Sequence, residues 1–152
     1  TRVDQGQKFL HKGNKLKRGF QKAVPGLKEL LDKLSAIYAS TSKRGNGYIP
    51  SIAGNKIYCD SHHKLLVYLL QACEKVTCSA ALMLTMEQLE SEGIPYQPLI
   101  FYHDELDFMV PEQYAKRAAQ IAQEAFKKGP ELFNITIMDG NAKIGDNWYE
   151  CH

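Results

Sequence analysis

The chain has 152 residues, of which 44% are hydrophobic and 24% are charged. A chain of this length can bury about 68 to 70% of the surface that its unfolded form exposes, and its composition excludes the disordered and fibrous classes. The net charge of +2 hides an asymmetry. Residues 1–59 carry twelve Lys and Arg against three acids, whereas residues 60–152 carry seven against fourteen.

A basic segment lies near the start of the chain. Between Gln5 and Lys28 there is no carboxylate, as a surface that follows phosphates requires. A solvated helix face is the alternative interpretation. The cations of this segment are Lys8, Lys12, Lys15, Lys17, Arg18, Lys22 and Lys28.

Apolar periodicity predicts two helices in the first 47 residues, a short basic one over 14–24 and a second that begins at Pro25. The second helix ends in a loop over 40–47, which is rich in Ser, Gly and Asn. We therefore predict a helical domain over residues 1–47. The apolar positions of the second helix are Leu27, Leu30, Leu31, Leu34, Ile37 and Tyr38.

A small hairpin is predicted over residues 49–59, with Gly54-Asn55 as its two-residue turn and with Ile52 and Ile57 on its arms. A long helix follows. Ser61 caps it, and Gly93 and Pro95 end it near Glu92. Its first turns are apolar on all sides, so we expect it to lie in a core or between two masses of protein.

Two short apolar runs, 99–102 and 106–110, are separated only by His103, Asp104 and Glu105, which predicts a tight hairpin with its charges at the bend.

The remaining residues predict a helix over 111–128 that stops at Gly129-Pro130, and a last strand over 133–138. Trp148, in the tail, is expected to pack against the sheet. The fold class is α+β: a small antiparallel sheet backed by helices, with domains over 1–47 and 48–152.

The four cysteines form no CxxC pair, and their irregular spacing predicts reduced thiols rather than a disulfide framework. Gln71, Glu74 and Lys75 interrupt the longest apolar run, and the basic amino terminus lacks an apolar signal core. These features predict a cytoplasmic protein with no membrane anchor.

Asp104 and Glu105 are the candidate metal ligands. Neighbouring carboxylates at a hairpin bend suit Mg²⁺, which prefers oxygen ligands and keeps several waters. Adjacent strand residues point to opposite faces, so the two carboxylates bind one ion together only if the bend rotates them. Otherwise one of the two is the principal ligand. Acidic residues are also common at turns for structural reasons, and an inert bend is the alternative interpretation.

The order of these elements and three motifs resemble the family A (Pol I-like) DNA polymerases, and the phage replicative branch above all. The resemblance covers nearly the whole chain. It implies the carboxy-terminal portion of such an enzyme, with the end of the fingers in residues 1–47 and the end of the palm in residues 48–152. The motifs are Leu69-Leu70-Gln71, His103-Asp104-Glu105 and the ending from Gly145 to His152.

The resemblance implies that Asp104 is the palm carboxylate that holds two Mg²⁺ ions and that Glu105 supports the site. It implies that His103 touches the primer terminus and that Gln71 reaches the minor groove of the primer–template duplex, where the pattern of bases is degenerate. His63 stands where the family has Arg or His, eight residues before that Gln.

Val67 replaces the Asn that the family commonly has four residues before that Gln, so the set of minor-groove contacts is incomplete. Lys15, Lys17 and Arg18, in the basic segment, complete the predicted DNA-binding residues.

Several parts of the family pattern do not occur in the chain: the second metal-binding aspartate, the KxxxFxxxYG-like fingers helix that binds dNTP, the thumb and the exonuclease. A two-metal site that has only one of its two principal aspartates cannot hold both Mg²⁺ ions in the geometry that in-line transfer needs. We therefore expect a chain that is inactive alone and is completed by an upstream polymerase fragment, with primer–template DNA and dNTP as the other partners.

The first residue, Thr1, is not Met, which suggests a polymerase split just after the fingers nucleotide helix, either encoded in two pieces or processed. The alternative function is a non-catalytic DNA-binding module, in which residues 8–28 bind phosphates and the bend at 103–105 is inert. For a third, an independent metal-dependent nuclease, too few carboxylates converge.

Overall fold

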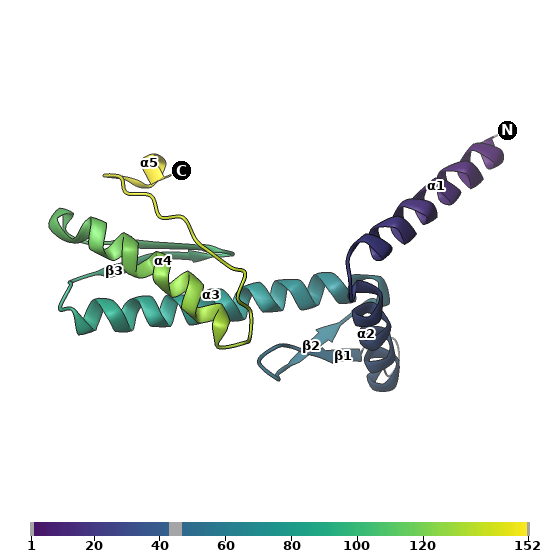
Figure 1. Cartoon of the computed structure of the whole chain (residues 1–152), viewed down its shortest axis with the longest axis horizontal. Coiled ribbons are helices and arrows are strands. Elements are labelled where there is room, and N and C mark those ends of the chain that lie inside the picture. Colours follow the sequence, from purple (N-terminus) through teal and green to yellow (C-terminus); the bar gives the residue numbers. More distant parts are fainter. Residues whose placement is uncertain (1, 43–46, 152) are drawn as a thin grey trace. The chain divides into compact units, whose positions relative to one another are not determined.

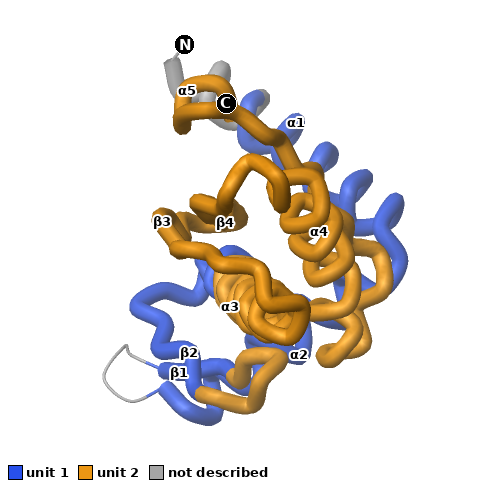
Figure 2. Tube along the Cα trace, turned by 90° about the vertical axis from the view of Figure 1, so that its left-hand side faces the viewer, with its two compact units in different colours: residues 1–49, 56–68 blue, residues 50–55, 69–152 orange. Residues whose placement is uncertain are grey.

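The computed structural model describes residues 2–42 and 47–151, which form two compact units (Figure 1; Figure 2). Unit 1 comprises residues 1–49 and 56–68, and unit 2 comprises residues 50–55 and 69–152. Helices and two small antiparallel sheets of two strands each make up the fold, so the predicted α+β class is confirmed. The predicted boundary after residue 47 concerns polymerase subdomains rather than packing units, and it stays a prediction.

Unit 1 begins with two helices, α1 (Arg2–Ala23) and α2 (Leu27–Thr41). α1 starts twelve residues before the helix predicted from residue 14, because Gly13 and Gly19 lower helix propensity without breaking a Pro-free segment.

The prediction that Pro25 begins α2 is wrong. Pro25 lies in the turn before the helix. Gly26 follows Pro25 with a φ of 79°, a left-handed conformation that ends one helix before the next begins. α2 buries Leu34 and Tyr38 and ends at Thr41. Most of the predicted loop, residues 43–46, lies outside the described residues.

The first hairpin consists of β1 (Gly47–Pro50) and β2 (Lys56–Cys59). Ile49 and Cys59 are fully buried, so one face of the hairpin belongs to the core of unit 1.

The turn of this hairpin is wider than predicted. The backbone N–H of Ser51 donates to the carbonyl of Asn55 (2.9 Å), so five residues close the loop and Ile52 lies in the turn rather than on an arm. The Ser51 hydroxyl accepts the N–H of Ala53 (3.1 Å) and bonds the Asn55 side chain. Such side-chain bonds stabilise a local turn, and they explain why the predicted Gly54-Asn55 turn is wrong.

The long helix begins as a short 3₁₀ turn, His62–Lys64, and continues as α3 (Leu65–Ser91). Ser61 has the extended backbone of an N-cap, but its side chain makes no capping bond to the helix backbone and contacts His63 Nδ1 instead (2.7 Å). α3 ends as predicted. Gly93 has a φ of 65°, and the N–H of Ile94 donates to the carbonyl of Leu89 (2.9 Å).

By length and composition alone, the helix His62–Ser91 could cross a membrane. Its buried residues instead contribute to the packing of unit 2. Ala81 lies against Gly129 of α4, and Leu89 belongs to the core cluster of the unit. The helix is therefore packed in part, with 22% of its most apolar 18-residue window buried.

The second hairpin, β3 (Gln97–Tyr102) and β4 (Glu105–Met109), lies beside α3 and α4 (Ala115–Glu131) in unit 2 (Figure 2). Its inner face packs against both helices. The core cluster comprises Leu89, Ile94, Ala118 and Ile121, with Tyr96, Phe108, Val110 and Tyr114 packed against it.

α4 follows a 3₁₀ turn at Glu112–Tyr114 and continues through the predicted stop at Gly129-Pro130 as far as Glu131. The left-handed residue that follows it is Asn134 (φ 60°), and the N–H of Ile135 donates to the carbonyl of Pro130 (3.1 Å). A proline in the last turn costs one hydrogen bond, and the neighbouring packing tolerates that loss.

Residues 133–138 contain no strand, contrary to the prediction. The side chain of Ile137, in the middle of this segment, is 92% exposed. Alternating apolar residues form a strand only beside a partner strand. A short helix near the end of the chain, α5 (Trp148–Cys151), was not predicted.

Replacing Gly129 by Ala should lower the free energy of unfolding by about 1 to 3 kcal/mol, because a Cβ there would lie 2.8 Å from the backbone nitrogen of Ala81. The overpacking outweighs the gain in helix propensity of about 1 kcal/mol that Ala has over Gly. The matched control is Gly19→Ala, where a Cβ meets nothing within 4 Å, and which should be neutral or stabilising. Urea unfolding measures both, and a Gly129→Ala chain as stable as the natural chain would contradict the packing.

The bond between Glu92 and Arg117 should make stability depend on pH. Two hydrogen bonds from Arg117 (2.8 and 2.5 Å) lower the pKa of Glu92 from 4.5 to about 2. Because the folded pKa lies below the unfolded one, the contribution is complete above pH 4.5 and is lost as the pH falls toward 2. Glu92→Gln should flatten the stability profile over that interval, whereas Glu87→Gln, at an exposed position of α3, should not. Equal profiles for the two variants in acid unfolding would contradict the pairing.

Candidate functional site

The three predicted residues His103, Asp104 and Glu105 meet at the tip of the β3–β4 hairpin. Tyr102 pairs with Glu105, so the turn consists of His103 and Asp104 alone, and Glu105 is the first residue of β4 rather than part of the bend. His103 has a φ of 53°, an uncommon conformation for a residue other than glycine. The turn leaves Asp104 exposed and Glu105 half-buried.

α3 supports this tip from one side. Glu74 Oε1 lies 3.7 Å from His103 Nδ1, and the ammonium of Lys75 lies 3.7 Å from the centre of the Phe101 ring. Gln71 is exposed one helical turn before these two contacts, at positions i−3 and i−4 on the same helix. The structure therefore brings the predicted residue Gln71 to the side of α3 that faces the hairpin tip.

The tip carries a negative field. The thiol of Cys78 is fully buried on α3, and burial raises its pKa, with further increases from the charges of Glu74 and Asp104. Glu74 and Asp104 therefore lie on the same side of unit 2 as Cys78, with Lys75 opposing part of their charge. Such a field favours a bound cation.

The hairpin tip borders a hollow of about 720 Å³ within unit 2. Asp104, Glu105 and Cys78 line one part of it, and residues 138–146 of the tail line another. The indole N–H of Trp148 donates to Glu105 Oε1 (3.4 Å), which joins the tail to the metal-binding candidates. Trp148 is 58% exposed, so it lies at the hairpin without being packed under it.

The carboxylate oxygens at the tip are ligand atoms of the kind that magnesium binds. The carboxylates of Asp104 and Glu105 are neighbours beside a hollow, and oxygen is the ligand that Mg²⁺ prefers. Over residues 2–42 and 47–151, no group of three or more His, Cys, Asp or Glu side chains converges as a metal site. Within those residues the tip therefore shows two neighbouring carboxylates and no complete metal site.

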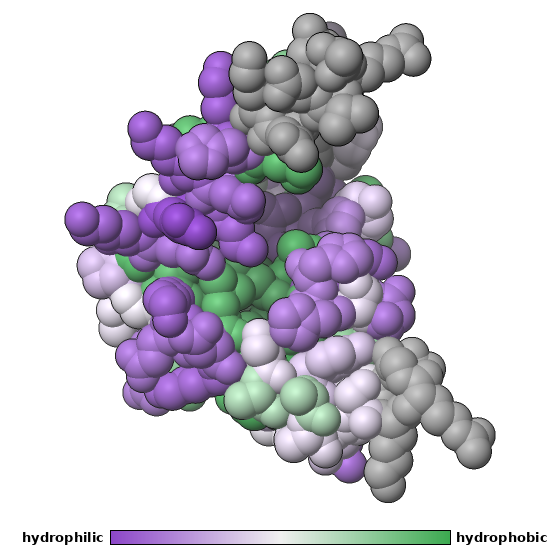
Figure 3. Space-filling view, turned by 90° about the vertical axis from the view of Figure 1, so that its right-hand side faces the viewer, coloured by the Kyte–Doolittle hydropathy of each residue, from purple (hydrophilic) through white to green (hydrophobic). Residues whose placement is uncertain are grey.

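The predicted DNA-binding cations Lys15, Lys17 and Arg18 are exposed on α1. Among the described residues, no ion pair involves them. The face in Figure 3 is mostly hydrophilic, with hydrophobic residues exposed between the hydrophilic ones. Lys8, also in the basic segment, has a side chain outside the described part.

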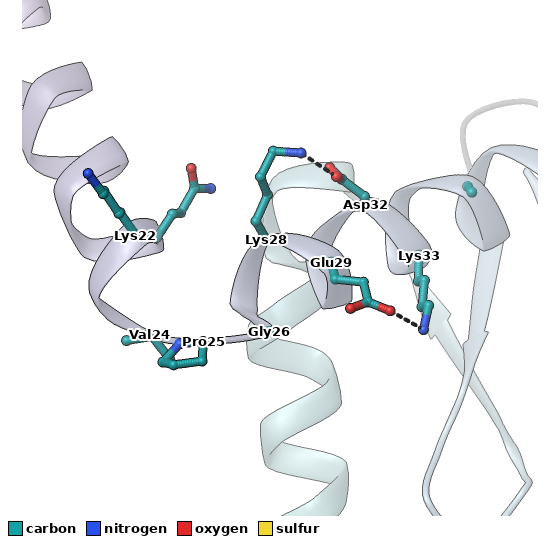
Figure 4. A pocket seen from close by; sticks show the side chains of 10 residues that line it. Lys22, Val24, Pro25, Gly26, Lys28, Glu29, Asp32 and Lys33 are labelled. Carbon is teal, nitrogen blue, oxygen red and sulfur yellow. Dashed lines mark hydrogen bonds and ion pairs between the residues drawn. The ribbon is translucent and has the colours of Figure 1, made fainter.

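The junction of α1 and α2 borders a hollow of about 570 Å³ (Figure 4). Lys28 bonds Asp32 and Lys33 bonds Glu29, both at 2.7 Å, so these two lysines of α2 are paired with carboxylates. The cations available for phosphates are therefore those of α1 rather than the whole basic segment. His63, the remaining predicted DNA-binding residue, is exposed in unit 1 and bonds Ser61.

The sequence interpretation missed Glu74, Cys78 and the contact of Trp148 with Glu105. Glu74 could have been found, because it lies three residues after Gln71 and so on the same side of the helix. The tail contact joins residues 43 positions apart, and no local pattern indicates it.

Comparisons with known proteins agree with the resemblance. No protein-family profile matches the chain. Over 158 aligned positions the chain is 27% identical to the DNA-directed DNA polymerase of Enterobacteria phage T3 and 25% identical to that of Escherichia phage T7. Each alignment covers 93% of this chain but only 22% of the relative, so the chain spans about a fifth of the length of the curated relatives it matches. Over nearly its whole length, the chain is similar to one part of the phage DNA-directed DNA polymerases.

Proposed function

We propose that the chain is the carboxy-terminal portion of a family A DNA-directed DNA polymerase of a phage, comprising the end of the fingers and the part of the palm with the β3–β4 hairpin. The observation that carries this is the hairpin tip. An exposed Asp104 beside Glu105 borders a hollow, on a chain similar to phage DNA polymerases over 93% of its length.

Each residue of the tip has a role in this proposal. Asp104 and Glu105 hold Mg²⁺, with Asp104 leading because it is the more exposed carboxylate. When bound, Mg²⁺ supplies charge stabilisation for the transfer of a nucleotide to a primer. His103 contacts the primer end, and its contact with Glu74 orients the ring. Gln71, on the same side of α3, contacts the minor groove of the primer–template duplex.

The site needs residues from outside these 152. The described residues provide no third ligand of the His, Cys, Asp or Glu type, and the curated relatives are about five times as long. We infer that the upstream part of a polymerase completes the metal site and binds dNTP, and that the isolated chain does not extend a primer. A polymerase of this kind acts on phage DNA in the cytoplasm of the host cell.

The exposed cations of unit 1 are compatible with phosphate contacts in either proposed class of function. The hydrophobic residues Val67, Leu70 and Met83 are also more than half exposed on α3. Val67 and Leu70 lie about one helical turn apart, and exposed apolar side chains so placed support an assembly in which further polypeptide covers this part of the helix.

In a polymerase reconstituted from this chain and the upstream polypeptide, Asp104→Asn should reduce Mg²⁺-dependent primer extension by at least about 100-fold, because a charge that stabilises the transition state is lost. The matched control is Asp139→Asn, which removes a carboxylate from the same hollow but not from the hairpin tip, and which should retain activity within about twofold.

Binding of the primer–template duplex, measured in parallel, should be the same for both variants. If primer extension by the Asp104→Asn enzyme equals that of the natural sequence, the catalytic assignment is wrong and the chain is better described as a non-catalytic DNA-binding module.

A further inference from the structure

The hairpin of β1 and β2 has two chemically different faces. Because strand residues alternate, Ile49 and Cys59 point into unit 1 and are fully buried. Tyr48, Lys56 and Tyr58 lie on the opposite face, where Lys56 and Tyr58 are exposed. The ring of Tyr58 is 74% exposed, so it contributes little to the core of the unit.

The side chains of the outer face are held together by mutual contacts. The Tyr48 and Tyr58 rings meet edge to face with their centroids 6.0 Å apart and their planes at 62°. The ammonium of Lys56 lies over the Tyr48 ring, 4.7 Å from its centre. An aromatic pair and a cation–π contact hold these side chains without burying them.

The backbone beneath this face is anchored to the end of α2. Thr41 Oγ1 accepts the N–H of Tyr48 (3.0 Å) and donates to the carbonyl of Tyr48 (2.7 Å). Gly47 lies so close to the Tyr38 ring that a Cβ would approach its carbons to 2.9 Å. β1 is therefore fixed in place, and Tyr48 and Tyr58 are positioned before any ligand binds.

The charge of unit 1 selects an anionic ligand. Thirteen Lys and Arg against four Asp and Glu give the unit a net charge of +9. An exposed aromatic ring beside an ammonium group matches the two parts of a nucleotide, a base that stacks and a phosphate that is negative. A duplex hides the faces of its bases, so the matching form of nucleic acid is an unpaired strand.

We propose that the outer face of the β1–β2 hairpin (Figure 1) binds single-stranded DNA, with a base stacked on Tyr58 and a phosphate next to Lys56. The choice of DNA among nucleic acids rests on the proposed function. This surface is additional to the residues assigned above, which are Gln71, His63, His103 and the cations of α1. It gives the protein a contact with a strand that has no pairing partner, such as unpaired template.

The test compares the affinity of the chain for a labelled oligo(dT) of about 15 nucleotides with that for an abasic strand of equal length and charge, by fluorescence anisotropy. Tyr58→Ala should weaken binding of oligo(dT) about fivefold or more, and should change binding of the abasic strand less than twofold. Tyr58→Phe, which keeps the ring, should bind like the natural chain. Tyr149→Ala removes a tyrosine that is 85% exposed in unit 2 and is the matched control, without effect on either strand.

Lys56→Ala should weaken binding of both strands and reduce the dependence of log affinity on log salt by about one. Thermal unfolding of each variant checks that the hairpin is intact. The proposal is overturned if Tyr58→Ala leaves oligo(dT) binding unchanged, if it weakens both strands equally, or if a polyglutamate peptide competes as well as oligo(dT).

Failure of this inference and failure of the proposed function give different results. The Asp104→Asn variant should bind oligo(dT) normally, because the tip of the β3–β4 hairpin is not part of the proposed surface on the β1–β2 hairpin. A reconstituted enzyme that extends primers while Tyr58→Ala binds oligo(dT) normally overturns only the inference. An inactive enzyme with Tyr58-dependent binding of oligo(dT) overturns only the proposed function.

Discussion

Packing of the β3–β4 hairpin against α3 and α4 is the interaction on which the candidate site depends. An isolated two-stranded hairpin is marginally stable in water, and this one gains its stability from Phe108 and Val110 against the cluster around Leu89 and Ile121. The packed inner face leaves the two-residue turn free to expose Asp104. The close approach of Gly129 to Ala81 sets the distance between the two helices beneath the hairpin.

The two units carry net charges of opposite sign. Unit 1 carries a net charge of +9, and unit 2 carries six Lys and Arg against thirteen Asp and Glu, a net charge of −7. A net positive unit favours polyanions, whereas a net negative unit favours cations. A polymerase needs both, because its substrates are polyanions and its chemistry runs on magnesium held by carboxylates.

The elements that local chemistry defines could be predicted from the sequence. The tight bend between two apolar runs correctly predicted the β3–β4 hairpin. Gly93 correctly predicted the end of α3, because the left-handed conformation that ends a helix depends on the residue at that position. Elements that depend on distant partners could not. The segment 133–138 has the alternation of a strand but no strand beside it, and α4 passes through Gly129-Pro130 because that glycine packs on α3.

The same distinction applies to the site. His103, Asp104 and Glu105 were identified because they are neighbours in the sequence, and Gln71 because the Leu69-Leu70-Gln71 motif resembles a known family. The contact of Trp148 with Glu105 and the effect of Asp104 on Cys78 depend on the tertiary fold. Lys28 shows a further limit, since its i,i+4 ion pair with Asp32, a residue beyond the carboxylate-free segment, removes one lysine from the cations that looked available.

Asp104 is, as we propose, a metal ligand whose companion ligand lies outside these 152 residues. Binding of Mn²⁺, which replaces Mg²⁺ in oxygen sites, tests it most directly when followed by electron paramagnetic resonance. We predict that the isolated chain binds Mn²⁺ weakly, that the upstream polypeptide makes binding at least about tenfold tighter, and that Asp104→Asn abolishes this gain. Binding by the isolated chain as tight as by the complex, or a complex whose affinity is unaffected by Asp104→Asn, would contradict the account.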